Sequence, residues 1–162
     1  ILTFMSVQDF RYRAISWYAF PLLALFLLLE NLQLSLTEVG LNLGFILLNY
    51  ALTTAMISLK YGRIVNLMNQ HIGVGDLLML FCLALYFPAL NFFLFYLGSL
   101  LLIAIGSGLY IIFNRPKAYT VPLAGLQSIL LLFLMLSAWT FELQLNKADW
   151  IEHQYWFQNY LL

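Results

Sequence analysis

The sequence predicts an all-α, polytopic membrane protein with about six transmembrane helices and a C-terminal helix lying on the membrane surface. Of the 162 residues, 64% are hydrophobic and only 9% are charged, whereas about 25% of residues are charged in soluble domains. Long apolar runs also recur along the chain, and in lipid such runs satisfy their backbone groups as helices. A transmembrane barrel would instead show alternating polarity over segments of about ten residues.

Six apolar runs predict the transmembrane helices: residues 1–7 (the end of a first helix), 15–29, 39–59, 76–87, 92–113 and 121–141. The third run is the clearest, because about twenty residues suffice for a hydrocarbon core of roughly 30 Å. Pro88 stops the fourth helix, and Pro122 lies in the first turn of the sixth, where proline is favoured. Residues 142–162 mix aromatic and charged side chains, as interfacial helices do. The chain therefore divides into a transmembrane core, residues 1–141, and an interfacial tail, residues 142–162.

The basic residues indicate the orientation of the helices. They fall in alternate loops: Arg11 and Arg13, then Lys60 and Arg63, then Arg115 and Lys117. The positive-inside rule places these loops in the cytoplasm, so that both termini of a six-helix protein face outside. Asp9 then ends the first helix and Asp76 begins the fourth on the same, cytoplasmic side.

Two aspartates at the ends of apolar runs are the most informative residues. A carboxylate at the edge of a hydrocarbon core is costly, and two carboxylates that share a site push their pKa values apart, so that one serves as acid and one as base. Gly73 and Gly75 precede Asp76 and would let the backbone bend sharply and a substrate strand approach. Two simpler interpretations stay open. Asp9 could pair with Arg11 or Arg13 at a membrane boundary, and Asp76 could be a helix N-cap.

The segment Gly73-Val74-Gly75-Asp76 resembles the GxGD motif of the intramembrane-type aspartyl proteases, and among these the prepilin and preflagellin leader peptidases are most similar. The stretch from Asp9 to Ser16, DFRYRAIS, resembles the segment around that family's first catalytic aspartate. A weaker third likeness is TVPLAG, which begins at Thr120 and includes Pro122. In the family, the first aspartate ends the first core helix and the GxGD aspartate opens the fourth, as in the topology predicted here.

The resemblance implies an aspartic endopeptidase of a prokaryotic cytoplasmic (inner) membrane. Asp9 and Asp76 would be its catalytic pair, with Gly73 and Gly75 as backbone support. The substrate would be a prepilin-like precursor with a basic leader and an apolar helix, cleaved at the cytoplasmic face, commonly after a glycine. Its recognition would involve Pro122, Lys60 and Arg63. Many members have a base shortly after the GxGD aspartate, whereas Leu77, Leu78 and Met79 follow here.

The composition of the chain limits which partners, metal sites and other functions are possible. Seven basic and seven acidic residues leave no net charge, so the sequence predicts lipid contact and no nucleic-acid partner. The single cysteine, Cys82, excludes an internal disulfide and a four-cysteine metal site, and it leaves no cysteine-rich domain of the kind that accompanies N-methylation in the family. We expect no metal and no cofactor. The alternative function is an inactive membrane scaffold or assembly protein of the same fold. A small transporter fits less well, because both acids lie at one membrane edge.

Overall fold

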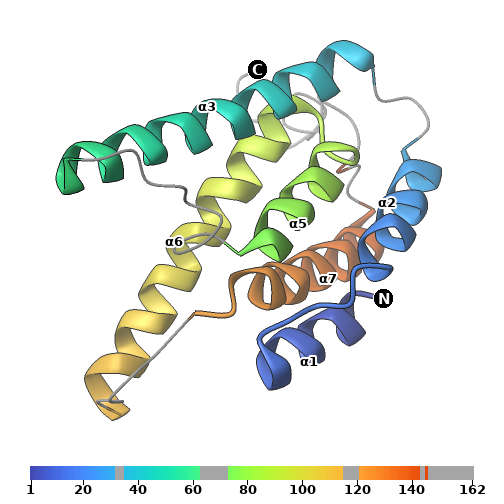
Figure 1. Cartoon of the computed structure of the whole chain (residues 1–162). Coiled ribbons are helices and arrows are strands. Elements are labelled where there is room, and N and C mark those ends of the chain that lie inside the picture. Colours follow the sequence, from blue (N-terminus) through green and yellow to red (C-terminus); the bar gives the residue numbers. More distant parts are fainter. Residues whose placement is uncertain (32–34, 63–72, 115–120, 143–144, 146–162) are drawn as a thin grey trace, which may run out of the picture.

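Helices make up nearly all of the part of the chain that the structure, a computed structural model, describes: residues 1–31, 35–62, 73–114, 121–142 and 145. The helices are α1 (Leu2–Tyr12), α2 (Ala19–Glu30), α3 (Leu36–Tyr61), α5 (Val74–Ala84), α6 (Ala89–Asn114) and α7 (Leu123–Phe141) (Figure 1). The all-α fold class predicted from the apolar runs is confirmed.

Three of these helices, α3, α6 and α7, are long and apolar enough to cross a membrane. The helices α1, α2 and α5 have 11 or 12 residues and extend only about 17 Å, short of a hydrocarbon core of about 30 Å. The structure thus supports a membrane protein with three helices of spanning length. The six crossings predicted from the sequence stay a prediction, and the predicted interfacial helix lies outside the described residues except for Glu142 and Leu145.

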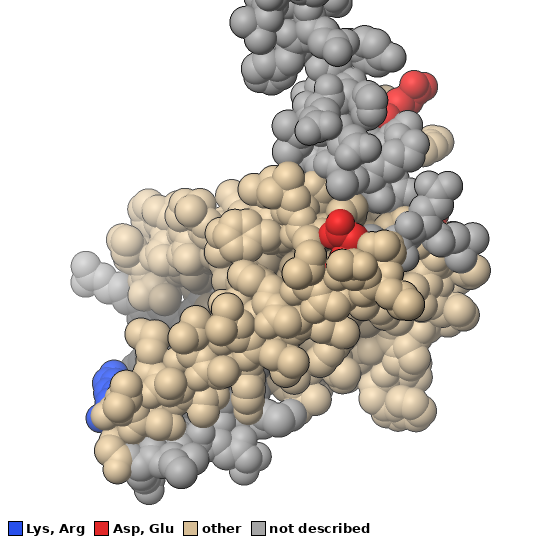
Figure 2. All heavy atoms as spheres, turned by 90° about the horizontal axis from the view of Figure 1, so that it is seen from above, with Lys and Arg blue, Asp and Glu red and all other residues tan. Residues whose placement is uncertain are grey.

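Helix α5 lies at the centre of the packing, because it contacts α2, α3, α6 and α7, while α1 packs along α7. Met79 and Leu83 of α5, Met5 of α1 and Leu131 of α7 are completely buried in this core. Large apolar side chains cover the outer faces of the long helices, as expected for surfaces that contact lipid. Figure 2 shows a face on which nearly all described atoms are neither acidic nor basic.

The first helix is longer than the sequence predicts. It continues through the charged segment to Tyr12 and ends at Arg13, whose left-handed backbone (φ 53°) forms the C-cap. Asp9, predicted to end this helix, therefore lies three residues before its end. The following segment is tied to α1, because the Gln8 side chain both donates to Ser16 Oγ (2.9 Å) and accepts from Ser16 N–H (3.0 Å). The second helix begins at Ala19, four residues later than predicted.

The corner between α5 and α6 is held by amide side chains from other helices. Asn42 Nδ2 of α3 donates to the carbonyl oxygens of Ala84 (3.1 Å) and Phe87 (2.8 Å). Asn31 Nδ2 donates to the carbonyl oxygen of Tyr86 at 2.6 Å. These carbonyls follow the last turn of α5, where a helix leaves acceptors without partners in the helix itself. The two asparagines thus fix the end of α5 and, through it, the position of its first turn.

Replacing Asn42 with leucine is expected to lower the stability of the protein. The substitution keeps the branching and the number of heavy atoms of the side chain but leaves two buried carbonyls without donors, at a cost of about 1–3 kcal/mol for each unsatisfied group. Thermal unfolding in detergent measures the change. Asn114→Leu is the control, because this exposed amide donates to Tyr110 O within its own helix. Equal melting temperatures for the two variants would contradict the role assigned to Asn42.

Candidate active site

Asp9 lies in the last turn of α1 on the face that packs against α7, and it is only 9% exposed. Its Oδ2 atom accepts a hydrogen bond of 2.6 Å from the backbone N–H of Gly125, in the first turn of α7. Gly125 makes this approach possible, because a Cβ atom there would lie 2.9 Å from both Cβ and Oδ2 of Asp9. The contact therefore depends on the absence of a side chain at position 125.

Asp76 lies in the first turn of α5, outside the three helices of spanning length. Its Oδ1 atom accepts a hydrogen bond of 2.8 Å from the backbone N–H of Ala124. Burial raises the pKa of the Asp76 carboxyl, the hydrogen bond from Ala124 opposes this rise, the charge of Asp9 adds to it, and a hydrogen bond from the Gly73 backbone lowers it. The net shift is upward, so the site favours a protonated Asp76.

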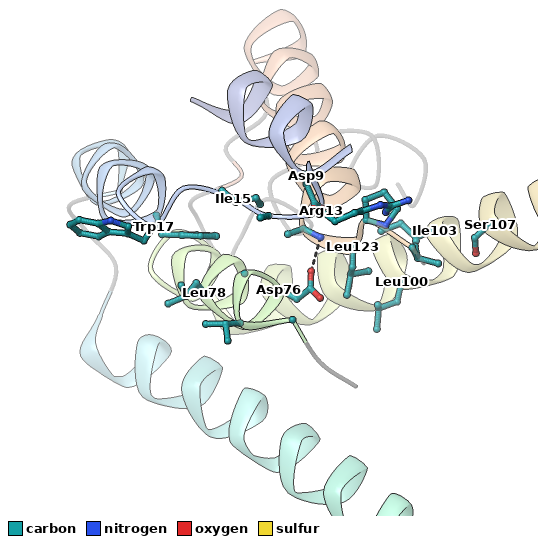
Figure 3. A pocket seen from close by; sticks show the side chains of 18 of the residues that line it. Asp9, Arg13, Ile15, Trp17, Asp76, Leu78, Leu100, Ile103, Ser107 and Leu123 are labelled. Atoms are coloured by element: carbon teal, nitrogen blue, oxygen red, sulfur yellow. Dashed lines mark hydrogen bonds between the residues drawn. The ribbon is translucent and has the colours of Figure 1, made fainter. Parts of the chain in front are cut away.

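Two consecutive amides at the start of α7 thus hold one carboxylate each. Three covalent bonds separate the nitrogens of Ala124 and Gly125, so the two bound oxygens lie less than about 10 Å apart. The positive end of a helix dipole stabilises negative charge at this position. Figure 3 shows Asp9 and Asp76 reaching from α1 and α5 towards the same end of α7.

Both aspartates line a cavity of about 950 Å³ between α1, α5, α6 and α7. Its walls are mostly apolar and include Ile103 of α6 and Leu123 of α7, whereas Arg13 supplies a cation (Figure 3). Ligand sites in proteins commonly measure about 300–1,000 Å³ and combine apolar walls with a few polar groups. The cavity can therefore receive a peptide segment, with both carboxylates at its wall.

The two glycines of the predicted motif have different surroundings. Gly73 is the N-cap of α5 with an extended backbone (φ −69°, ψ 134°), and Gly75 lies in the first turn of the helix, so neither adopts the left-handed conformation that requires glycine. A Cβ atom at Gly73 would lie 3.0 Å from Oδ2 of Asp76, so this glycine leaves room for the carboxylate. A Cβ atom at Gly75 would meet only Phe20, at an ordinary 3.6 Å. Gly73 also occupies the N-cap position that the sequence allowed for Asp76.

The three residues predicted to contact substrate differ in where they lie relative to this cavity. Pro122 is the N-cap of α7, is buried and lines the cavity beside both aspartates. Lys60 is exposed in the last turn of α3 and does not line this cavity. Arg63 lies outside the described residues. Among the residues that the structure describes, no group of three or more His, Cys, Asp or Glu side chains could hold a metal ion.

The residues that join the two aspartates could not be recognised from the sequence. Ala124 and Gly125 contribute backbone N–H groups, and their side chains give no sign of this role. The only signal is their place in the TVPLAG stretch, which resembles the protease family less strongly than the aspartate segments do. Arg13, expected to mark a boundary, lines the cavity.

Comparisons with protein-family models, with curated proteins and with solved structures give no match for this chain. The functional argument therefore depends on the arrangement of its own residues.

Proposed function

We propose that this chain is a membrane-embedded aspartic endopeptidase that cleaves the leader peptides of prepilin-like precursors, without N-methylation, at the cytoplasmic face of a prokaryotic membrane. One observation supports this proposal above the others. Asp9 and Asp76, which are 67 positions apart in the sequence, accept hydrogen bonds from neighbouring amides and line one cavity. If either aspartate only stabilised the fold, the other aspartate would not need to lie beside it.

The two carboxyl groups divide the chemistry of peptide hydrolysis. Burial favours a protonated Asp76, which donates a hydrogen bond to the carbonyl oxygen of the scissile peptide. Ionised Asp9 accepts a proton from a water molecule, whose oxygen attacks the carbonyl carbon. The resulting tetrahedral intermediate breaks its C–N bond, and the leaving nitrogen takes a proton from the pair. The products are a new carboxyl group and a new amine.

The orientation predicted from the basic loops places this chemistry beside the cytoplasm. Arg11 and Arg13 end α1, and Lys60 ends α3, each in the last turn or at the cap of its helix. A precursor with a basic leader in the cytoplasm and an apolar helix in the membrane would present its junction at this depth. In the six-crossing topology, α1, α2 and α5 would each take part in a crossing together with neighbouring residues.

The proposal is tested with purified protein in detergent and a synthetic precursor. The precursor has a leader with two lysines and a terminal glycine, followed by about twenty leucine and alanine residues, a length that spans a bilayer. Mass spectrometry in heavy-oxygen water should show one cut after the glycine and one labelled oxygen in the new carboxyl group. Added S-adenosylmethionine should leave the mass of the new amine unchanged. An uncut precursor that still binds the protein would favour the scaffold alternative.

Asp76→Asn is also expected to raise the melting temperature, by an amount that grows as pH rises above about 4, the ordinary pKa of an aspartate carboxyl. The raised pKa means that the folded protein holds a proton that the unfolded chain has released, so wild-type stability falls as pH rises through this range. Asparagine has no such proton and can still accept from Ala124. Glu142→Gln, at an exposed position, is the control. A gain that is equal at every pH would contradict the raised pKa.

A further inference from the structure

A second, smaller cavity adjoins Asp76. It measures about 160 Å³ and lies between α3, α5 and α6. Asp76, Leu100 and Leu123 line both this cavity and the larger one. The carboxylate that would act on the scissile peptide is therefore reached from two directions, the second of which passes between α3 and α6.

The second direction opens between two helices of spanning length. Figure 1 shows α3 and α6 diverging towards their C-terminal ends, and residues of both helices and of α5 line the small cavity. Met56 of α3, which is exposed, lies three residues beyond Thr53, a residue that lines the small cavity. Because both helices are long and apolar enough to cross a membrane, the opening faces the lipid and not only the water phase.

The walls of the small cavity suit one residue of an unwound apolar segment. Ile46, Leu77 and Leu80 provide apolar surface, and a cavity of about 150 Å³ can hold a ring as large as benzene. Asn49 also lines it, and because its Nδ2 group donates to Phe45 O within α3, its Oδ1 atom is left as an acceptor. A peptide that unwinds for cleavage exposes N–H groups, which are costly in lipid without an acceptor.

We propose that the apolar helix of the substrate approaches laterally between α3 and α6, and that the residue beside the scissile bond inserts its side chain into the small cavity. The Asn49 Oδ1 atom then accepts a hydrogen bond from an N–H group of the unwound segment. This inference rests on the proposed function for the identity of the substrate. It adds the side from which the substrate arrives and the residues that receive it.

Crosslinking tests the position of the substrate without any need for cleavage. A photoreactive phenylalanine replaces Thr53, which lines the small cavity, or Leu52, which does not, in the Asp9→Asn, Asp76→Asn double variant; both residues are exposed. The probe is the synthetic precursor described above, in liposomes. The residue at position 53 should crosslink to the start of the apolar helix with at least about tenfold higher yield than the residue at position 52. Equal yields, or crosslinks to lipid alone, would overturn the inference.

Filling the small cavity tests its use during cleavage. Thr53→Phe should lower kcat/KM at least about tenfold for a precursor with leucine after the cut, and much less for one with alanine there. Leu52→Phe should leave both substrates unaffected. Cleavage that is insensitive to Thr53→Phe would overturn the inference and leave the proposed function standing. Selective crosslinking at position 53 without wild-type cleavage would overturn the proposed function and support the lateral approach.

Discussion

Asp9→Asn and Asp76→Asn are each expected to abolish cleavage of the synthetic precursor, with a loss of roughly a thousandfold or more. Asparagine is nearly isosteric with aspartate, and its carbonyl oxygen can still accept from Gly125 or Ala124, the two amides that hold the wild-type carboxylates. The fold should therefore survive, while the proton acceptor or the proton donor is lost. Single-turnover cleavage, followed by mass spectrometry, gives the rate for each variant.

The double variant distinguishes a catalytic pair from two independent residues. Groups that act as a unit show strongly non-additive losses, so Asp9→Asn, Asp76→Asn should be about as slow as either single variant. Glu38→Gln is a control in another part of the molecule, because Glu38 Oε2 accepts from Ala89 N–H (2.6 Å) at the start of α6. It is expected to cleave at the wild-type rate. Substantial cleavage by either single aspartate variant would exclude the proposed mechanism.

The apolar runs predicted which segments form helices better than they predicted where each helix ends. The reason is physical. The charged residues that begin at Asp9 suggested that the first helix ends there, yet α1 continues to Tyr12. The carboxylate of Asp9 is tolerated inside the packed bundle because Gly125 N–H, 116 positions away, donates to it. A local pattern of charge cannot reveal a partner so distant in sequence, and the boundary prediction failed at this residue.

At the candidate site, too, some residues could be predicted from the sequence and others could not. Asp9 and Asp76 could be selected from the sequence, because an acid at the edge of an apolar run is costly and needs a reason. The residues that bring them together could not, because Ala124 and Gly125 act through backbone N–H groups that every residue except proline has. Gly75 was selected with the motif, although the space around it would admit a methyl group. Close approach to a neighbour, and not the motif alone, determines which glycine is required.

This difference between glycines predicts that Gly125→Ala lowers the rate of cleavage much more than Gly75→Ala does. The new methyl group would lie 2.9 Å from Asp9 Cβ and Oδ2 and would push the carboxylate off the amide of residue 125. A displacement of about 1 Å at a catalytic group can cost a hundredfold in rate, and we expect a loss of about that size in kcat with little change in KM. The measurement is steady-state cleavage of the synthetic precursor.

Gly75→Ala is the matched comparison, because its methyl group would meet Phe20 at an ordinary 3.6 Å and should change the rate by less than about threefold. Both glycines lie within helices, where alanine raises helix propensity by up to about 1 kcal/mol, so helix propensity itself lowers the stability of neither variant. Melting temperatures of the two variants check this point. If Gly75→Ala were the slower enzyme, the space beside Asp9 would not control the rate. The proposal that the α7 amides position the two carboxylates for catalysis would then be wrong.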